Sequence, residues 1–161
     1  MQAQRTVGDT FQYTGVEPYG GKETTVTVKP IPANNGIVFS NNGFIPAKIQ
    51  NASCILRSVL LSSGESKVLN VEHILADLYA YGIDNALVEV RSKKSKAYER
   101  LERFGIAKST EIIPYLDERE LPICELLEEV GTFEQDEPRR ILRPRQAVFH
   151  DHGPDGAYIE V

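Results

Sequence analysis

The chain has 161 residues, and at a usual domain size of roughly 100–200 residues we expect one domain, or one domain and the start of a second. Its 18 basic and 23 acidic residues give a formal net charge of −5, which argues against DNA or RNA as a partner, because nucleic-acid affinity depends mainly on neutralising phosphates. No stretch approaches the roughly 20 apolar residues of a transmembrane segment, and the start lacks the apolar run of a secretory signal. Cys54 and Cys124 fit neither a disulfide framework nor a metal knuckle, so we expect buried thiols and a cytoplasmic location.

The first 70 residues are expected to form strands and turns. Residues 24–28 alternate threonine with valine, as a half-buried strand does, and residues 36–39 form a short apolar run between turn signals. The dipeptide Asn42-Gly43 predicts a tight hairpin turn in which both residues have a positive φ.

An amphipathic helix is expected to begin at Asn70, a residue suited to the N-cap, and to end at Gly82, a residue suited to a left-handed stop. Its apolar residues recur at the spacing of one continuous helical stripe, namely Val71, Ile74, Leu75, Leu78 and Tyr79. Residues 85–90 then return to strand character.

Two more helices are expected, over residues 95–104 and from about residue 121 to residue 130. The acidic, proline-containing stretch 134–138 is expected to be a linker between a first domain, residues 1–133, and a C-terminal piece, residues 139–161. That piece predicts two strands around a Gly-Pro-Asp-Gly turn. Such an incomplete hairpin must dock on something, because two strands cannot bury a core alone.

The predicted amphipathic helix carries the strongest candidate for chemistry, at Glu72 and His73. Adjacent helical residues point about 100° apart. A metal held by His73 would therefore leave Glu72 beside the ligands, where a carboxylate can deprotonate a metal-bound water. Asp77, one turn further along, is a candidate second ligand or a partner that orients the imidazole. The alternative is an ordinary exposed helix face with a His–Asp pair.

His150 and His152 form a second candidate metal site. Their i, i+2 spacing would put both side chains on one face of a strand, although a histidine-containing hairpin rim without a ligand explains the same pattern. Gly20-Gly21-Lys22 resembles part of a phosphate-binding loop. Val16 and Glu23 occupy the positions where that motif requires Gly and Ser or Thr, so no nucleoside triphosphate site is expected.

Two adjoining segments have a distinctive sequence: residues 70–78 read Asn-Val-Glu-His-Ile-Leu-Ala-Asp-Leu, and residues 81–90 read Tyr-Gly-Ile-Asp-Asn-Ala-Leu-Val-Glu-Val. They resemble the Thr-Val-Glu-His helix and the Gly-Ile-Asp-Asn strand of the UDP-3-O-acyl-N-acetylglucosamine deacetylases, the zinc amidases of lipid A biosynthesis. Three upstream segments resemble the same family in the same order, namely residues 5–6, 14–16 and 28–39. The resemblance covers residues 4–91 well, and the expected C-terminal hairpin resembles the opening of the family's second domain.

The resemblance implies an α+β fold, in which a two-layer domain of sheet on helices is followed by an incomplete β-hairpin. It implies that His73 is a ligand of a Zn2+ cofactor, that Glu72 is the general base, and that the substrate is a UDP-acyl-aminosugar whose N-acetyl amide is hydrolysed. The family's other zinc ligands, a His-x-x-x-Asp pair, and its second catalytic histidine have no match in this chain. Tyr19 stands where the family has histidine, and Arg57 lies in the segment that lines the family's substrate pocket, so both are candidate substrate contacts.

Three interpretations remain open. In the first, the chain is the N-terminal part of a deacetylase that needs a second domain or a separate second-half polypeptide. In the second, it is a non-catalytic binding module that retains the fold. In the third, two copies build a metal site from His73 and Asp77 together with the two C-terminal histidines. Residues 91–119 have no counterpart that we recognise in the family and are interpreted as an insertion.

Overall fold

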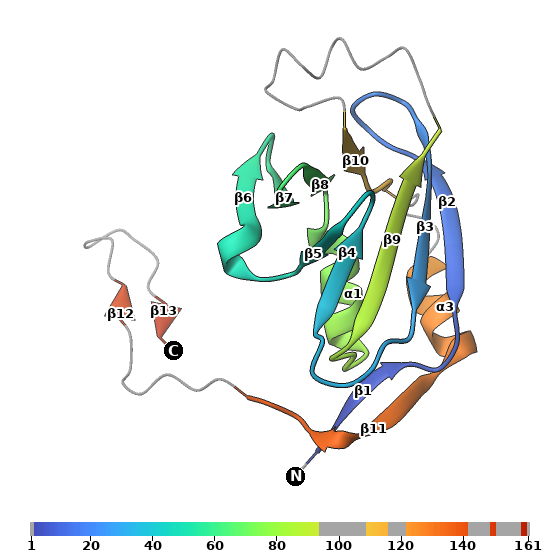
Figure 1. The fold of residues 1–161 in the computed structure, drawn as a ribbon, viewed down its shortest axis with the longest axis vertical. Helices are drawn as coiled ribbons and strands as arrows, with labels where there is room; N and C mark the ends of the chain where they lie inside the picture. Colours follow the sequence, from blue (N-terminus) through green and yellow to red (C-terminus); the bar gives the residue numbers. More distant parts are fainter. Residues whose placement is uncertain (1, 94–108, 116–121, 142–148, 151–158, 161) are drawn as a thin grey trace.

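The computed structural model describes residues 2–93, 109–115, 122–141, 149–150 and 159–160 (Figure 1). The elements in chain order are β1 (Ala3–Val7), β2 (Phe11–Val16), β3 (Glu23–Lys29), β4 (Ile37–Ser40), β5 (Phe44–Pro46), the 3-10 helix η1 (Ile49–Asn51), β6 (Ala52–Ile55), β7 (Ser58–Ser63), β8 (Ser66–Leu69), α1 (Glu72–Ala80), β9 (Ala86–Ser92), β10 (Thr110–Ile112), α3 (Pro122–Val130), β11 (Thr132–Pro138), β12 (Phe149–His150) and β13 (Ile159–Glu160).

A five-stranded sheet in the order β2-β3-β9-β4-β5 is the largest sheet of the described residues, with β4 parallel to β9 and the other neighbours antiparallel. The alternation in β3 buries Val26 and Val28 completely and leaves Thr25 and Thr27 half-buried on the opposite face. The strands predicted over residues 24–28, 36–39 and 85–90 are confirmed as β3, β4 and β9.

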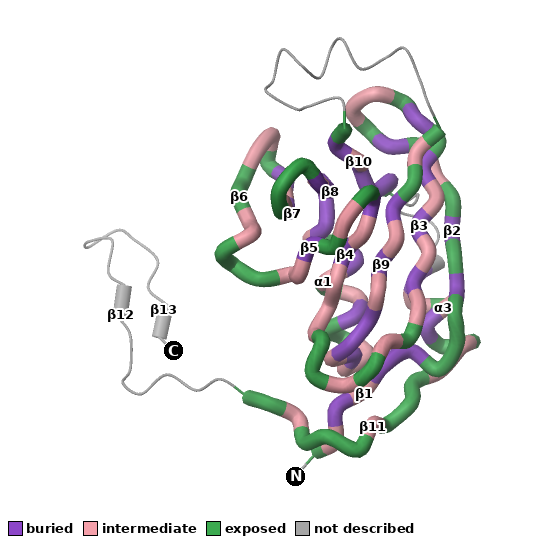
Figure 2. Tube along the Cα trace, in the orientation of Figure 1, coloured by how far each residue is buried: buried purple, intermediate pink, exposed green. Residues whose placement is uncertain are grey.

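Helices α1 and α3 cover one face of this sheet, so the α+β class predicted from the sequence is confirmed (Figure 1). Ile74 and Leu78 of α1 and Leu127 of α3 are at most 1% exposed, and they share one core with the buried valines of β3 and β9 (Figure 2). Burying each such side chain contributes roughly 1.5–3 kcal/mol. This packing is what holds the two helices on the sheet.

A four-stranded sheet has the order β10-β8-β7-β6, with β10 parallel to β8. Leu56-Arg57 forms the two-residue turn between β6 and β7, and both residues are left-handed, with φ of 51° and 64°. Arg57, which the family resemblance places in the pocket-lining segment, therefore lies in a turn, and strand β7 begins at Ser58. Within the expected insertion, 91–119, residues 110–112 are β10, an integral strand of this sheet.

Helix α1 ends at the glycine that the sequence predicted. Gly82 has φ 69°, its N–H donates to the Tyr79 carbonyl, and the Ile83 N–H donates to the Leu78 carbonyl, both at 2.9 Å. These two bonds are those of a Schellman motif. Tyr79 was expected in the apolar stripe but is 81% exposed, because it lies at the margin of the stripe, beyond the buried contact with the sheet.

The N-cap prediction for Asn70 is wrong. Val71 occupies the N-cap position, and Asn70 is left-handed, with φ 71°. The Asn70 amide donates to the Ile113 carbonyl at 2.8 Å and accepts from the Ser58 hydroxyl at 3.2 Å. Its polar groups are therefore used by long-range partners rather than by the first turn of the helix.

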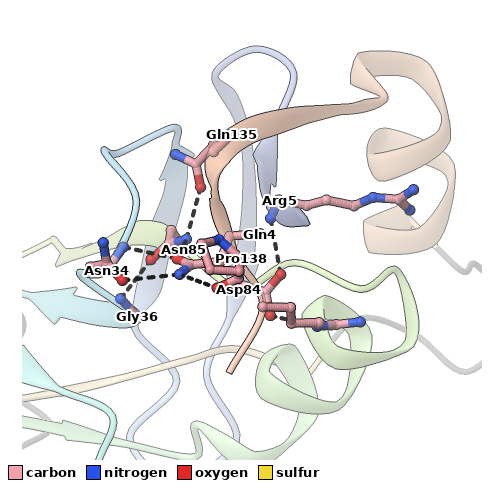
Figure 3. A network of polar contacts seen from close by, with 9 residues as sticks. Gln4, Arg5, Asn34, Gly36, Asp84, Asn85, Gln135 and Pro138 are labelled. Carbon is pink, nitrogen blue, oxygen red and sulfur yellow. Dashed lines mark hydrogen bonds and ion pairs between the residues drawn. The ribbon is translucent and has the colours of Figure 1, made fainter. Parts of the chain in front are cut away.

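The stretch expected to be a linker is a strand. Residues 134–138 lie in β11, which pairs antiparallel with β1. Figure 3 shows the contact that anchors this pair: Asn85, 1% exposed, donates to both Gln4 and Gln135 at 2.8 Å. The acidic, proline-containing composition belongs to an exposed edge strand, for which such residues are typical.

The hairpin of β4 and β5 exists, but its turn differs from the prediction. A three-residue loop, 41–43, connects the strands, and neither Asn42 nor Gly43 has a positive φ. A Cβ at position 43 would lie 2.7 Å from the Ser66 hydroxyl oxygen, so a larger residue there would require this hydroxyl to move.

The remaining predictions have mixed outcomes. Cys54 is exposed rather than buried, since it lies on the edge strand β6, and Cys124 is partly exposed. Helix α3 confirms the helix predicted from about residue 121 to residue 130. In the C-terminal piece, β12 pairs antiparallel with β13. The helix predicted over 95–104 lies outside the described residues.

Candidate active site

Glu72 and His73 occupy the first turn of α1, outside the hydrophobic core. The Glu72 carboxylate oxygen Oε2 accepts a 3.0 Å hydrogen bond from the backbone N–H of Val59, at the start of β7. An acidic side chain is also stabilised in this position by the positive end of the helix dipole. His73 is exposed. The structure therefore fixes the carboxylate and leaves the imidazole accessible.

The His73 ring packs edge-on against Tyr115, with ring centroids 5.0 Å apart and an interplanar angle of 88°. Tyr115 follows β10 and is 45% exposed. A T-shaped ring pair contributes about 0.5–1.5 kcal/mol beyond the area it buries. Tyr115 therefore restricts the orientation of the imidazole.

Three hydroxyl groups, those of Tyr19, Ser58 and Tyr115, form what we term the hydroxyl cluster. The Tyr19 and Ser58 hydroxyl oxygens lie 2.8 Å apart, and the Tyr19 hydroxyl also donates to the Leu56 carbonyl at 3.3 Å. Burial raises the pKa of Tyr115, a hydrogen bond with Ser58 opposes that rise, and Tyr19 and Glu72 add to it. The cluster therefore borders the Glu72 carboxylate.

Asp77 lies one helical turn after His73 and is partly buried. Burial raises the pKa of Asp77, and the His73 charge opposes this rise, so the two side chains are within electrostatic reach of each other. Burial, and secondarily Asp77, raises the pKa of Tyr13 on β2. Asp77 is thus within electrostatic reach of both an exposed histidine and a buried tyrosine, and it can bias the orientation of the imidazole.

The described residues contain no group of three or more His, Cys, Asp or Glu side chains close enough together to hold a metal ion. His73 and Asp77 supply two donors, whereas catalytic zinc normally has three protein ligands and a water. His150 and His152 were predicted as a second metal-binding pair. His150 lies in β12, no described contact joins it to His73, and His152 falls outside the described residues. What is described fits one part of a zinc site and does not complete it.

The sequence model of the UDP-3-O-acyl N-acetylglycosamine deacetylase (LpxC) family matches residues 4–160. The chain belongs to this family. A UDP-3-O-acyl-N-acetylglucosamine deacetylase of Pseudomonas entomophila is 31% identical over an alignment of 158 positions that covers 95% of this chain and 46% of that protein. The bifunctional enzyme LpxC/FabZ of Chlorobaculum tepidum is 33% identical over an alignment of 154 positions that covers 92% of this chain and 29% of that protein. A deacetylase of Actinobacillus pleuropneumoniae is 30% identical over an alignment of 166 positions, gaps included, that covers 99% of this chain and 48% of that protein.

This LpxC-family chain spans about half the length of these deacetylase relatives, and less of the bifunctional one. Within its described residues, neither helix has the length and apolar character needed to cross a membrane.

Sequence reasoning placed Glu72, His73 and Tyr19 in one region but missed three residues that the fold adds to it. Ser58 and Asn70 arrive through the pairing of β7 with β8, and Tyr115 arrives because β10 runs beside β8. Arg57 lies in the adjoining turn, with its side chain exposed. The one sequence signal for Tyr115 is the short apolar run before it, which ends in Pro114 and is typical of a buried strand.

Proposed function

We propose that this chain carries one half of a zinc-dependent deacetylase site, in which Glu72 is the general base and His73 a zinc ligand. The observation that carries the proposal is the pairing of a fixed carboxylate with an accessible imidazole at the start of α1. The family supports it, because the relatives are named as deacetylases of UDP-3-O-acyl-N-acetylglucosamine. We therefore propose a UDP-acyl-aminosugar as the substrate.

Hydrolysis of the N-acetyl amide needs an activated water and a path for its proton. Zinc, when bound, lowers the pKa of a coordinated water and polarises a carbonyl oxygen. The Glu72 oxygen Oε2 is occupied by the Val59 N–H, so Oε1 is the atom that we expect to take the proton. The edge contact with Tyr115 holds the His73 ring in one orientation for its ligand role.

The substrate side of the site is proposed to use the hydroxyl cluster and Arg57. The hydroxyls of Tyr19 and Ser58 can donate to and accept from sugar hydroxyl groups. The exposed Arg57 guanidinium can pair with a diphosphate oxygen. Substitution Arg57→Gly is therefore expected to weaken binding of the nucleotide part without altering zinc binding.

Completion of the site requires ligands beyond those described here. We propose that residues 1–138, through β11, form one domain and that residues 139–161 belong to the next, which supplies the remaining ligands, in the same polypeptide or in a separate one. A second copy of this chain is the alternative source. The free thiols of Cys54 and Cys124 suit a reducing compartment, and we propose a cytoplasmic location on that ground.

A non-catalytic binding module is the second candidate function. It is favoured by the absence of a three-ligand cluster within the described residues and by Tyr19, which stands where the family resemblance places histidine. The Glu72→Gln variant separates the two candidates, because a binding module should retain its partners while a catalytic half should lose hydrolysis by orders of magnitude.

The test is acetate release from UDP-3-O-acyl-N-acetylglucosamine by this chain mixed with a polypeptide that carries the second half of the Pseudomonas entomophila relative. We expect zinc-dependent release that Glu72→Gln abolishes. Release by the intact relative alongside, with none from any mixture, would count against the deacetylase proposal.

A further inference from the structure

The loop between β2 and β3 is folded around a buried carboxylate. Glu17 is 1% exposed, and its two oxygens accept hydrogen bonds from three backbone N–H groups. Tyr19 donates to Oε2 at 2.7 Å, Gly20 donates to Oε1 at 2.8 Å and to Oε2 at 2.9 Å, and Lys22 donates to Oε1 at 3.2 Å. Every contact is charge-assisted, the stronger class of protein hydrogen bond.

The backbone of the loop closes on itself around this carboxylate. The Glu17 N–H donates to the Lys22 carbonyl at 2.8 Å, and the Gly21 N–H donates to the Glu17 carbonyl at 3.2 Å. Gly21 is left-handed, with φ 69°. Successive N–H groups in such a turn form a concave nest for an anion. In this chain the anion is the side chain of the loop's own first residue.

This arrangement changes the interpretation of Gly20-Gly21-Lys22. The amides that a phosphate-binding loop would offer to a ligand are already bonded to Glu17. Burial lowers the pKa of Lys22, while Glu111 and Glu17 raise it, so the carboxylate also has a cationic side chain within electrostatic reach. The loop therefore holds an internal anion.

Tyr19 connects this loop to the candidate active site. Its N–H is bonded to Glu17, and its hydroxyl lies 2.8 Å from the Ser58 hydroxyl oxygen. Ser58 directly precedes Val59, whose N–H holds Glu72. An unbroken series of bonds thus joins the buried carboxylate of the loop to the carboxylate of the site.

We propose that Glu17 is a positioning residue: its carboxylate fills a backbone anion nest and thereby holds Tyr19 in the hydroxyl cluster beside Glu72 and His73. The proposal rests on the proposed function only for the chemistry of the site that Tyr19 borders. Occupancy of the nest and the position of Tyr19 are properties of this chain alone.

The test uses metal-free protein and measures amide hydrogen exchange and the NMR signals of Tyr19, Tyr115 and His73. In Glu17→Gln, which keeps the shape but loses the charge and sets an NH2 group against the backbone donors, we expect exchange at Tyr19 and Gly20 to rise by roughly tenfold or more. The Tyr19 and Tyr115 signals should shift together. Tyr81, whose hydroxyl bonds to Glu128 away from the loop, should not respond.

Glu17→Ala empties the nest, and added formate is expected to restore protection of the same amides, a recovery that loss of a merely structural contact would not show. Glu65→Gln, at an exposed glutamate in the turn between β7 and β8, is the matched control and should change none of these signals.

Wild-type rates of amide exchange at Tyr19 and Gly20 in Glu17→Gln would overturn the proposal. So would failure of formate to restore the Glu17→Ala loop while β9 stays protected. If β9 also loses protection in Glu17→Ala, that variant has lost more than the loop, and the exchange measured in Glu17→Gln then decides whether the proposal holds. Because no zinc or substrate is present, these outcomes do not depend on deacetylation.

Discussion

The Glu72 carboxylate accepts a 3.0 Å hydrogen bond from the backbone N–H of Val59, and this bond ties the first residue of α1 to the second residue of strand β7. The same side chain is therefore both a structural acceptor and the proposed general base. Substitutions can separate the two roles, because a glutamine keeps an acceptor oxygen but cannot serve as a base.

We expect Glu72→Gln to unfold within about 2 °C of the wild type, since the Val59 N–H keeps a partner. Glu72→Ala should lose about 1 kcal/mol of unfolding free energy, a decrease in Tm of roughly 2–4 °C. Thermal unfolding followed by circular dichroism measures both. Equal destabilisation by Gln and Ala would show that the hydrogen bond to Val59 does not stabilise the start of α1.

Asn70→Ala should be among the most destabilising changes near the site. The substitution leaves the Ile113 carbonyl and the Ser58 hydroxyl without this partner. It also places alanine at a left-handed φ of 71°, which asparagine tolerates better because its side chain can form local hydrogen bonds. We expect a loss of roughly 3 kcal/mol in urea unfolding, with Asn70→Gly less costly by about 1 kcal/mol because glycine tolerates that φ. The exposed Asn42→Ala is the control, expected within about 0.5 kcal/mol of the wild type. A small effect of Asn70→Ala would contradict the role assigned to this junction.

Both two-residue turns of the four-stranded sheet have a left-handed position at which glycine should be favoured. Arg57 is left-handed without being glycine, so Arg57→Gly should raise the unfolding free energy by about 1 kcal/mol. Gly64 is left-handed with φ 58° in the matching turn, so Gly64→Ala should lower it by about 1 kcal/mol. Urea unfolding of both variants checks the pair. A non-glycine residue at this strained backbone position agrees with the binding role proposed for Arg57.

Much of the α+β body could be predicted from local pattern alone. The period-2 alternation of β3 and the glycine stop of α1 are local signals, and both were confirmed. The N-cap prediction at Asn70 was wrong because its amide is used by Ile113, 43 residues away, and no local pattern carries that information. Tyr115 was missed for a similar reason, since only the parallel pairing of β10 with β8 brings it to His73.

The linker prediction over residues 134–138 was wrong because composition reports exposure and not pairing. β11 is exposed along most of its length, so its side chains are polar, yet its backbone pairs with β1. The decisive contacts come from Asn85, which lies between Gln4 and Gln135 (Figure 3). An amide network of this kind depends on tertiary placement that the sequence pattern does not reveal.

Asn85→Ala should loosen β11 from the body. The change leaves Gln4, Gln135 and the Gly36 N–H without the Asn85 partner in a buried position. We expect a loss of roughly 2–4 kcal/mol and faster hydrogen exchange in β1 and β11 than in β3. Asn35→Ala, at an exposed residue that bonds only to nearby carbonyls, is the matched control. Uniform loss of protection across all strands would contradict a local anchoring role.

The stability of the metal-free protein should depend on Asp77 in a defined direction. Its pKa is raised in the folded state, so between its ordinary value and the raised value the folded chain binds more protons than the unfolded chain. Its contribution to stability therefore falls as pH rises through that interval. Asp77→Asn should remove this fall and stabilise the protein at neutral pH, whereas the exposed Asp136→Asn should not. Chemical unfolding at a series of pH values in the presence of a chelator measures the slope, and an unchanged slope in Asp77→Asn would contradict this assignment.

Zinc binding to the purified chain tests the proposed half-site most directly, by competition with a chromophoric chelator and by elemental mass spectrometry. We predict that His73→Ala lowers zinc affinity by at least roughly tenfold, while Glu72→Gln binds zinc as the wild type does. Zinc binding that is indifferent to His73→Ala would contradict the assignment of His73 as a metal ligand of this chain.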